Sequence, residues 1–363
     1  MKKIEIFFKR LFLRWILFSG KRKKSDSLIE LTKGVKVLCI RLNRIGDALV
    51  VTPFLHKLKV TTGCEITVLA DRNNHFVFRN NPDITTVLIY EKGAEGTGKL
   101  LKKINKTGYQ VVIDLHDDVS VTVSYILKNL KADYIAGLKR GNSQLFTHLI
   151  EKPDPRKYHV IDRCLKLAEL FTNNEQPISS SIIPAIRYFP SREDIENVNR
   201  YFEGKFSGSG FVVGINISAG SMARYWGTEN FRKLVEYFKE KNIDYLLLCS
   251  TRDIKLSLDI DPYSERTFYT PGFGEFCAMV GKINLLFSPD TATVHLASIY
   301  SIPVFGLYVK YETEDVIWYP YNTRYEATVT SSPTLKDVKF LDVMEKFEPF
   351  LNDELKRHED SRL

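Results

Sequence analysis

The chain has 363 residues, of which 44% are hydrophobic, so it is long enough to bury two cores of ordinary size. Its formal net charge of +8 arises in residues 1–24, which hold nine Lys and Arg side chains and one Glu, whereas the rest of the chain holds 43 basic and 43 acidic side chains. This balance excludes a general polyanion-binding surface, and no nucleic-acid partner is expected. Five cysteines without C-x-x-C spacing predict buried thiols in a reducing compartment and exclude a disulfide framework.

Residues 1–24 have the pattern of an amphipathic helix that lies on a membrane surface. Cations interrupt the apolar residues, so no run approaches the roughly 18 residues that span a bilayer, and no small-residue cleavage site is evident. A basic face opposite an aromatic-rich face suits an anionic membrane interface, whereas a helix packed on the body of the protein is the alternative. The apolar face comprises Ile4, Phe7, Phe8, Leu11, Phe12, Trp15 and Phe18, and the polar face comprises Lys2, Lys3, Lys9, Arg10 and Arg14.

From residue 34 onward the sequence alternates between strand-like apolar runs and helix-length segments. Such alternation is typical of parallel, doubly wound sheets, and a looser stretch within 170–208 separates two α/β domains. The strand-like runs lie at 35–42, 65–70, 84–90, 109–115 and 132–138, and then at 210–217, 245–250, 283–288 and 302–308. The expected parts are a basic amphipathic helix at 1–30, Rossmann-like domains at 34–175 and 205–335, and a C-terminal helix and tail at 336–363.

Two short motifs suggest other chemistry, but each lacks a required part. The G-x-x-x-x-G-K match at 93–99 is followed by Leu100, where a phosphate-binding loop needs Ser or Thr to hold Mg²⁺. The DLHDD cluster at 114–118 gathers carboxylates and His116 at a strand end, but adjacent strand residues point to opposite faces and seldom ligate one ion. We therefore expect neither an NTPase nor a metal site, and no cofactor.

The segment RLNRIGDALVVTPFLHKLK, residues 41–59, places Asp47 where a strand turns into a helix. Aspartate is a favoured helix N-cap, so the spacing by itself favours a cap. Ligands of open α/β sheets bind at the carboxyl ends of strands, so a carboxylate that acts on a substrate is the alternative.

Two strand–turn–helix segments in the second half offer places for an anion. The first, 214–238, passes through a polar loop with Ser218 and Arg224 to a helix for which Thr228 is the expected N-cap. The second, 283–308, turns at Asp290 or Thr291 into a helix whose first amides, at 291–294, would face an anion. Two such places on one strand edge indicate a phosphorylated ligand, and two ordinary capped helices are the alternative.

These segments occur in the order seen in glycosyltransferase family 9, the ADP-heptose:lipopolysaccharide heptosyltransferases, which the chain resembles over about residues 34–350. The shared motifs are Arg-x-x-x-x-Gly-Asp followed by Thr-Pro, at 41–53, and Asp-Thr-x-x-x-His followed by Leu-Ala, at 290–297. The resemblance implies an α/β protein of the GT-B fold, in which two Rossmann-like doubly wound domains face each other across a cleft without a metal requirement.

The resemblance also implies residue roles. Asp47 corresponds to the expected general base, and Arg41 or Arg44 is a candidate to hold acidic groups of the acceptor. Gly227 stands where relatives often have Pro, and Ala292 where they commonly have Gly, which narrows the space beside the donor diphosphate. The residues expected to bind the donor are Ser218, Arg224, Asp290, Thr291, Ala292, Thr293, Val294 and His295.

The function expected from the resemblance is inverting, metal-independent transfer of a heptose, or a related sugar, from an ADP-sugar. The acceptor would be a lipopolysaccharide core or a similar surface glycolipid. A glycolipid acceptor agrees with a cytoplasmic enzyme held on the inner face of the membrane by residues 1–24. Two alternatives remain, a catalytically degenerate membrane-associated protein of this fold and a transferase that modifies protein or another glycan.

Overall fold

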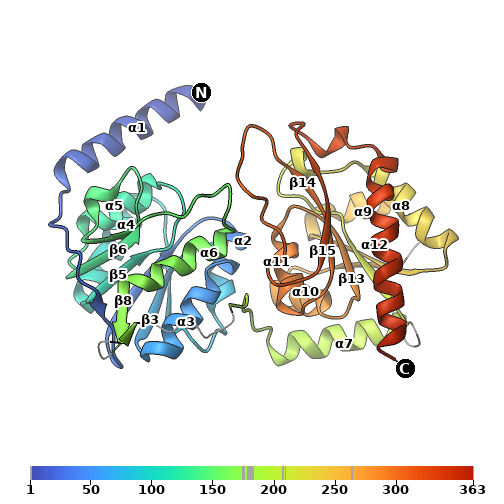
Figure 1. The fold of residues 1–363 in the computed structure, drawn as a ribbon, viewed down its shortest axis with the longest axis horizontal. Coiled ribbons are helices and arrows are strands. Elements are labelled where there is room, and N and C mark those ends of the chain that lie inside the picture. Colours follow the sequence, from blue (N-terminus) through green and yellow to red (C-terminus); the bar gives the residue numbers. More distant parts are fainter. Residues whose placement is uncertain are drawn as a thin grey trace. The chain divides into compact units, whose positions relative to one another are not determined.

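The computed structural model divides the chain into two compact units, Met1–Pro184 (unit 1) and Ala185–Leu363 (unit 2), as Figure 1 shows. Residues 178–183, inside the stretch expected to join two domains, lie outside the described part. The residues that the structure describes are 2–173, 176–177, 184–206, 208, 210–262 and 265–362.

Unit 1 is built on a parallel sheet with the strand order β4-β3-β2-β5-β6-β7. The chain begins at the centre, moves to one edge, returns and continues to the other edge, which is the Rossmann order. The strands are β2 (Lys36–Arg41), β3 (Glu65–Asp71), β4 (Thr86–Tyr90), β5 (Val111–Asp114), β6 (Tyr134–Leu138) and β7 (His148–Ile150). The helices are α1 (Lys2–Ser19), α2 (Ile45–Leu49), α3 (Thr52–Thr62), α4 (Ala94–Thr107), α5 (Val121–Asn129) and α6 (Val160–Leu165), with 3₁₀ turns η1 (His75–Phe78), η2 (Ser143–Leu145) and η3 (Lys166–Leu170).

A small separate sheet also belongs to unit 1. Its strand β1 (Ile29–Glu30) pairs in parallel with β8 (Phe171–Asn173), and β8 pairs antiparallel with β9 (Gln176–Pro177). The sheet therefore ties the segment after α1 to the segment after α6, which lie far apart in the sequence.

Unit 2 repeats the same topology, with the strand order β12-β11-β10-β13-β14-β15 and parallel pairing throughout. Its strands are β10 (Val212–Asn216), β11 (Asp244–Cys249), β12 (Thr267–Tyr269), β13 (Leu285–Pro289), β14 (Val304–Val309) and β15 (Tyr325–Thr330). Its helices are α7 (Arg192–Phe206), α8 (Thr228–Glu240), α9 (Ile254–Ile260), α10 (Phe273–Val280), α11 (Ala292–Ile299) and α12 (Phe340–Asp360), with 3₁₀ turns η4 (Met222–Arg224), η5 (Thr251–Asp253) and η6 (Leu335–Asp337). Two parallel Rossmann-like sheets confirm the predicted α/β fold class.

The core of unit 2 is aromatic and includes the last helix. Phe347 of α12 packs against Phe238, Phe287 and Phe305, so α12 covers the sheet of its own unit. The buried indole N–H of Trp226 donates to the carbonyl of Val338 at 3.0 Å, which fixes the segment leading into α12.

Helix α1 lies on the outside of unit 1 beside α5, as Figure 1 shows. Ile16 is fully buried, the ring of Phe12 stacks on Tyr125, and the ammonium of Lys128 lies 3.8 Å from the ring centroid of Trp15. A helix is therefore present, but it ends at Ser19 and not near residue 30 as expected, and its second half packs on the body, in agreement with the alternative. Among the described residues, no helix combines the length and the hydropathy needed to cross a membrane.

Candidate active site

In each sheet the strand order reverses between two neighbouring strands, β2 and β5 in unit 1 and β10 and β13 in unit 2. Ligands of open α/β sheets bind at this point, outside the carboxyl ends of the strands. Asp47 follows β2 and Asp290 follows β13, so the sequence-predicted residues of each unit lie at its switch point.

Asp47 lies inside α2 and does not cap it. The N-cap position belongs to Arg44, and no side chain caps the helix. The carboxylate Oδ1 of Asp47 instead accepts a hydrogen bond from Nη2 of Arg41 at 2.6 Å, and its side chain is 20% exposed. The cap interpretation of Asp47 is therefore wrong, and its other oxygen, Oδ2, has no partner among the described residues.

The two arginines proposed for the acceptor lie in opposite surroundings. Arg41 is buried, and its guanidinium donates to the carbonyls of Asp47 and Leu115 as well as to the Asp47 carboxylate. Its donors are thus used inside the protein and are not presented to an acceptor. Arg44 is exposed, and its guanidinium has no hydrogen-bond or ion-pair partner in the described part of the chain.

A second buried network lies at the end of β5 in the DLHDD cluster, and its partner Arg140 was not predicted from the sequence. The carboxylate of Asp114 pairs with Nη2 of Arg140 at 2.6 Å and with Nδ1 of His116 at 2.7 Å. Burial by itself raises the pKa of Asp114, but the charge of Arg140 and the contacts with His116 outweigh it and lower the pKa to about 2. The Nε2 atom of His116 accepts the amide N–H of Leu42 at 3.2 Å, so this network also fixes the turn that leads to Asp47.

The carboxylates of the DLHDD cluster, which a metal ion would need as ligands, form ion pairs with basic side chains. Both oxygens of Asp117 accept hydrogen bonds from the buried guanidinium of Arg163, at 3.1 and 2.8 Å, and Lys152 lies 3.2 Å from one of them. Within the described ranges, no group of three or more His, Cys, Asp or Glu side chains is arranged to hold a metal ion.

At the switch point of unit 2, Asn216 joins the two strands. Its side-chain amide donates to the hydroxyls of Ser288 at 2.9 Å and Thr291 at 3.0 Å. Asn216 is buried at the end of β10, and this polar residue at a strand end was the available signal in the sequence, although its role was not predicted.

Arg224 and Asp290 form an ion pair, with Nη2 of Arg224 3.1 Å from Oδ2 of Asp290. Arg224 lies at the end of η4, and its side chain is 36% exposed. The cation and the carboxylate predicted for donor binding therefore contact each other, and a phosphate on Arg224 would compete with Asp290.

The first turn of α11 uses two of the amides that were expected to face an anion. Thr291 is the N-cap, and its hydroxyl accepts the amide of Thr293 at 3.3 Å, while its carbonyl accepts the amide of Val294 at 3.2 Å. The amide of Ala292, the first helical residue, has no such partner among the described residues. An anion at this helix start would therefore contact the Ala292 amide, where the positive end of the helix dipole lies.

His295 lies one turn into α11 and is buried, with an exposed fraction of 3%. Burial lowers the pKa of His295 to about 4, because the charged imidazolium would lose its hydration there. Its Nδ1 atom has no hydrogen-bond partner in the described part of the chain, and its ring centroid lies 6.2 Å from that of Trp318. His295 is therefore a neutral side chain with an unused polar atom near the helix start.

The hydroxyl of Ser218 is used to hold two loops together. It donates to Asp253 at 2.6 Å and accepts the amide of Ser250 at 2.8 Å. Gly227, and not Thr228, is the N-cap of α8, at φ 106°, ψ 141°. This positive φ strains any residue with a Cβ, which explains in physical terms why a glycine stands there.

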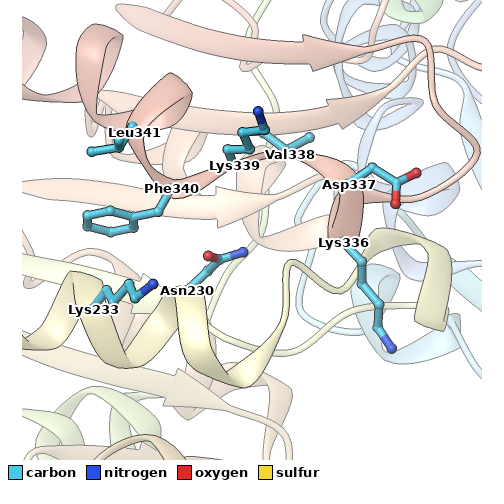
Figure 2. Close-up of a pocket in the computed structure, with 8 residues that line it drawn as sticks. All are labelled: Asn230, Lys233, Lys336, Asp337, Val338, Lys339, Phe340 and Leu341. Carbon is cyan, nitrogen blue, oxygen red and sulfur yellow. The ribbon is translucent and has the colours of Figure 1, made fainter.

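One open hollow in unit 2 lies away from these residues. Figure 2 shows the residues that line this open hollow of about 600 Å³, which come from α8 and from the segment running through η6 into α12. They are Asn230, Lys233, Lys336, Asp337, Val338, Lys339, Phe340 and Leu341, and none of them is a residue predicted to bind the donor.

Comparison with known proteins gives one consistent family. Residues 97–348 match the family described as glycosyltransferase family 9 (heptosyltransferase). The lipopolysaccharide core heptosyltransferase OpsX of Haemophilus influenzae is 22% identical over 293 residues, which cover 76% of this chain and 80% of that protein. The putative lipopolysaccharide heptosyltransferase 4 of Escherichia coli is 22% identical over 352 residues, or 93% of each protein.

Solved structures of the same family share the fold. A family 9 glycosyltransferase from Veillonella parvula has a TM-score of 0.75 at 18% identity, covering 90% of this chain and 99% of that one. The E. coli ADP-heptose lipopolysaccharide heptosyltransferase II has a TM-score of 0.67 at 15% identity, covering 88% and 99%. E. coli heptosyltransferase WaaC with ADP has a TM-score of 0.65 at 11% identity, covering 88% and 98%. With its family motifs at the switch points of two Rossmann-like sheets, this chain belongs to glycosyltransferase family 9, the heptosyltransferase family, and is a glycosyltransferase.

Proposed function

We propose that this enzyme moves a heptose, or a related sugar, from an ADP-sugar to a lipopolysaccharide core or a similar glycolipid, without a metal and with inversion. The names of the relatives and the ADP in one solved neighbour support the donor and acceptor classes. The observation that carries the proposal is the Asp47 carboxylate, which is held through Oδ1 and leaves Oδ2 open at the switch point of unit 1.

In the proposed reaction Asp47 acts as the general base. Its Oδ2 atom takes the proton of an acceptor hydroxyl while that oxygen forms a bond to the anomeric carbon of the sugar. The bond from the anomeric carbon to the diphosphate oxygen breaks in the same step, and the nucleoside diphosphate leaves with the electron pair. A single displacement inverts the anomeric configuration, and such general-base assistance contributes roughly 10²–10⁴-fold to the rate.

The donor diphosphate is proposed to lie at the start of α11. Arg224 would leave Asp290 to pair with the phosphates, while the Ala292 amide and the helix dipole stabilise the developing charge. Arg224 and Ala292 thus contact the leaving group, and His295 offers its unused Nδ1 atom nearby. Ser218 would act indirectly, because its hydroxyl holds the loop after β10 against Asp253. Thr293 and Val294 would also act indirectly, through the amide hydrogen bonds that shape the first turn of α11.

Arg44 is proposed to contact the acceptor. It is exposed next to α2, three residues before Asp47, and a free guanidinium suits the phosphate or carboxylate groups of an acidic glycolipid. Arg41 does not suit this role, because its guanidinium is buried and donates hydrogen bonds inside the protein.

Helix α1 is proposed to hold the enzyme on the anionic inner face of the cytoplasmic membrane. Five large apolar side chains of the predicted face are more than half exposed, and Arg10 and Arg14 are exposed as well. The basic contribution is smaller than the sequence predicts, since Arg22 donates to the carbonyls of Leu127 and Leu130. The exposed apolar residues are Phe7, Phe8, Leu11, Trp15 and Phe18, whereas the predicted side chains of Lys2, Lys3 and Ile4 lie outside the described part.

The test is to incubate the purified enzyme with ADP-heptose and a truncated glycolipid and to follow ADP release together with formation of the extended glycolipid. We expect turnover by the wild type without added metal and in the presence of a chelator. Asp47→Asn, which keeps the shape of the side chain but removes its basicity, should lower kcat roughly 10²–10⁴-fold. Asp47→Asn at a near wild-type rate would refute the role of Asp47 as base.

The other outcomes identify the alternatives. A protein that binds ADP-heptose without turning over any glycolipid would be the degenerate binding form of the fold. Turnover with a peptide or a different glycan, and not with the glycolipid, would assign the transferase to another acceptor.

A further inference from the structure

The guanidinium of Arg41 contacts Asp47 at two points. Its Nη2 atom donates to Oδ1 of the carboxylate at 2.6 Å, and its Nε atom donates to the main-chain carbonyl of the same residue at 2.8 Å. Because the guanidinium is planar and its N–H groups have fixed directions, these two bonds set both the position of the residue and the rotation of its carboxylate.

Arg41 is in turn anchored to the neighbouring strand. Its Nη1 atom donates to the carbonyl of Leu115, directly after β5, at 2.7 Å. The following residue, Leu42, donates its amide to His116, which is held by Asp114. Through these bonds the arginine fixes the short helix α2 relative to the β2–β5 pair, which forms the switch point.

A second arginine–aspartate pair in unit 1 has a purely structural role. Here too the guanidinium makes two hydrogen bonds to one aspartate, an arrangement that we call a fork. Arg163 is equally buried and contacts both carboxylate oxygens of Asp117, and its Nη1 atom donates to the carbonyl of Tyr158 at 2.7 Å. Asp117 is saturated by this fork, whereas Asp47 keeps one oxygen open because the second donor of Arg41 goes to the main chain.

We infer that Arg41 is a positioning residue, which fixes the Asp47 carboxylate so that Oδ2 alone is offered to the acceptor hydroxyl. This inference rests on the proposed role of Asp47 as the base. After proton transfer the new O–H lies on Oδ2, and Oδ1 keeps its hydrogen bond to Arg41.

The kinetic test compares Arg41→Lys with Arg163→Lys in the full-length enzyme. Lysine keeps the charge but cannot make both bonds of the fork. We expect Arg41→Lys to lower kcat about 100-fold with the acceptor KM within about twofold, because a small misplacement of a reacting group has an effect of this size. Arg163→Lys should lower the melting temperature as much as Arg41→Lys does, but it should keep kcat within about twofold of the wild-type value.

Two kinetic results would overturn the inference. One is a wild-type kcat in Arg41→Lys, and the other is a raised acceptor KM with kcat unchanged, which would make Arg41 an acceptor-binding residue after all. If the wild type releases no ADP with any acceptor, the proposed function fails, and the inference is decided by the following measurement.

The second measurement is hydrogen exchange of the α2 amides in the free enzyme, followed by mass spectrometry. In Arg41→Met, exchange in α2 should rise about tenfold or more, because the bonds that tie Asp47 to the β2–β5 pair are lost. Arg163→Lys should leave exchange in α2 at the wild-type level, and unchanged exchange in Arg41→Met would refute the positioning role.

Discussion

At the scale of single residues, the partners of a side chain decide its role more than its type does. Asp47, Asp114 and Asp117 all lie close to strand ends in unit 1, and each is bonded to an arginine. Asp114 and Asp117 have both oxygens bonded, so they stabilise the fold, while Asp47 has one oxygen to offer. Only the last arrangement suits proton transfer from a substrate.

His295 should make the stability of the free enzyme depend on pH. Its pKa is about 4 in the folded state, below the ordinary value of 6.5, so the unfolded chain binds the proton more tightly. The stabilisation is therefore complete above pH 6.5 and is lost as the pH falls towards 4, by roughly 1–3 kcal/mol. In His295→Gln this loss should be absent.

The measurement is the melting temperature of the wild type and of His295→Gln without donor. It is taken between pH 7.5 and about 4.5, because the unfolded chain takes up the proton within this pH range. The difference between the two proteins should shrink, or change sign, as the pH falls. A constant difference across this range would contradict a buried, neutral His295.

At the scale of elements, α1 is divided between two environments. Its second half packs on α5 through Ile16, a residue that was not assigned to the predicted apolar face, whereas Phe7, Phe8 and Phe18 point away from the core. These exposed aromatic side chains, together with Arg10 and Arg14, are the residues proposed to contact an anionic lipid surface.

The double variant Phe7→Gln/Phe8→Gln should bind more weakly to vesicles containing anionic lipid, because two exposed rings no longer enter the interface. A loss of about tenfold or more in partitioning is expected, measured by vesicle sedimentation, with an unchanged melting temperature. Val60→Gln, which removes an exposed apolar side chain on α3, is the control and should bind as the wild type does. Equal binding by all three proteins would refute the membrane role of α1.

At the scale of the whole molecule, each unit has its own sheet and its own core. Asp114 supports the switch point of unit 1, and Gly227 supports the start of α8 in unit 2. Their described contacts share no residue, so a change in one should not loosen the other unit.

Hydrogen exchange followed by mass spectrometry checks this independence. Asp114→Asn leaves Arg140 without its charge partner and should cost about 3–5 kcal/mol, raising exchange in β5 and β6 but not in β10 and β13. Gly227→Ala should cost about 1–3 kcal/mol through backbone strain and raise exchange in α8 alone. Gly220→Ala, at an open position without a positive φ, is the control for the second variant. Exchange that rises in both units with either change would show a single cooperative body.

The limits of prediction from the sequence follow the position of a strand in its sheet. The apolar runs predicted as strands correspond to β2–β6, β10, β11, β13 and β14, and most of these strands are buried on both faces. Three of the four edge strands of the six-stranded sheets, β7, β12 and β15, were not predicted and are only partly buried, whereas the fourth, β4, was predicted from its apolar run. An edge strand has less need for apolar residues, so its sequence carries a weaker signal.

The sequence by itself determined the alternation of strands and helices, the two-domain α/β fold and, through its motifs, the family. These properties follow from local spacing and from residues close together in the chain. Only the tertiary structure decided that Arg41 is anchored on Leu115 while it holds Asp47, and that Asn216 of β10 bonds to Thr291 at the start of α11. The physical reason is that crossovers between parallel strands bring together residues such as Arg41 and Leu115, 74 positions apart, and no local pattern records such partners.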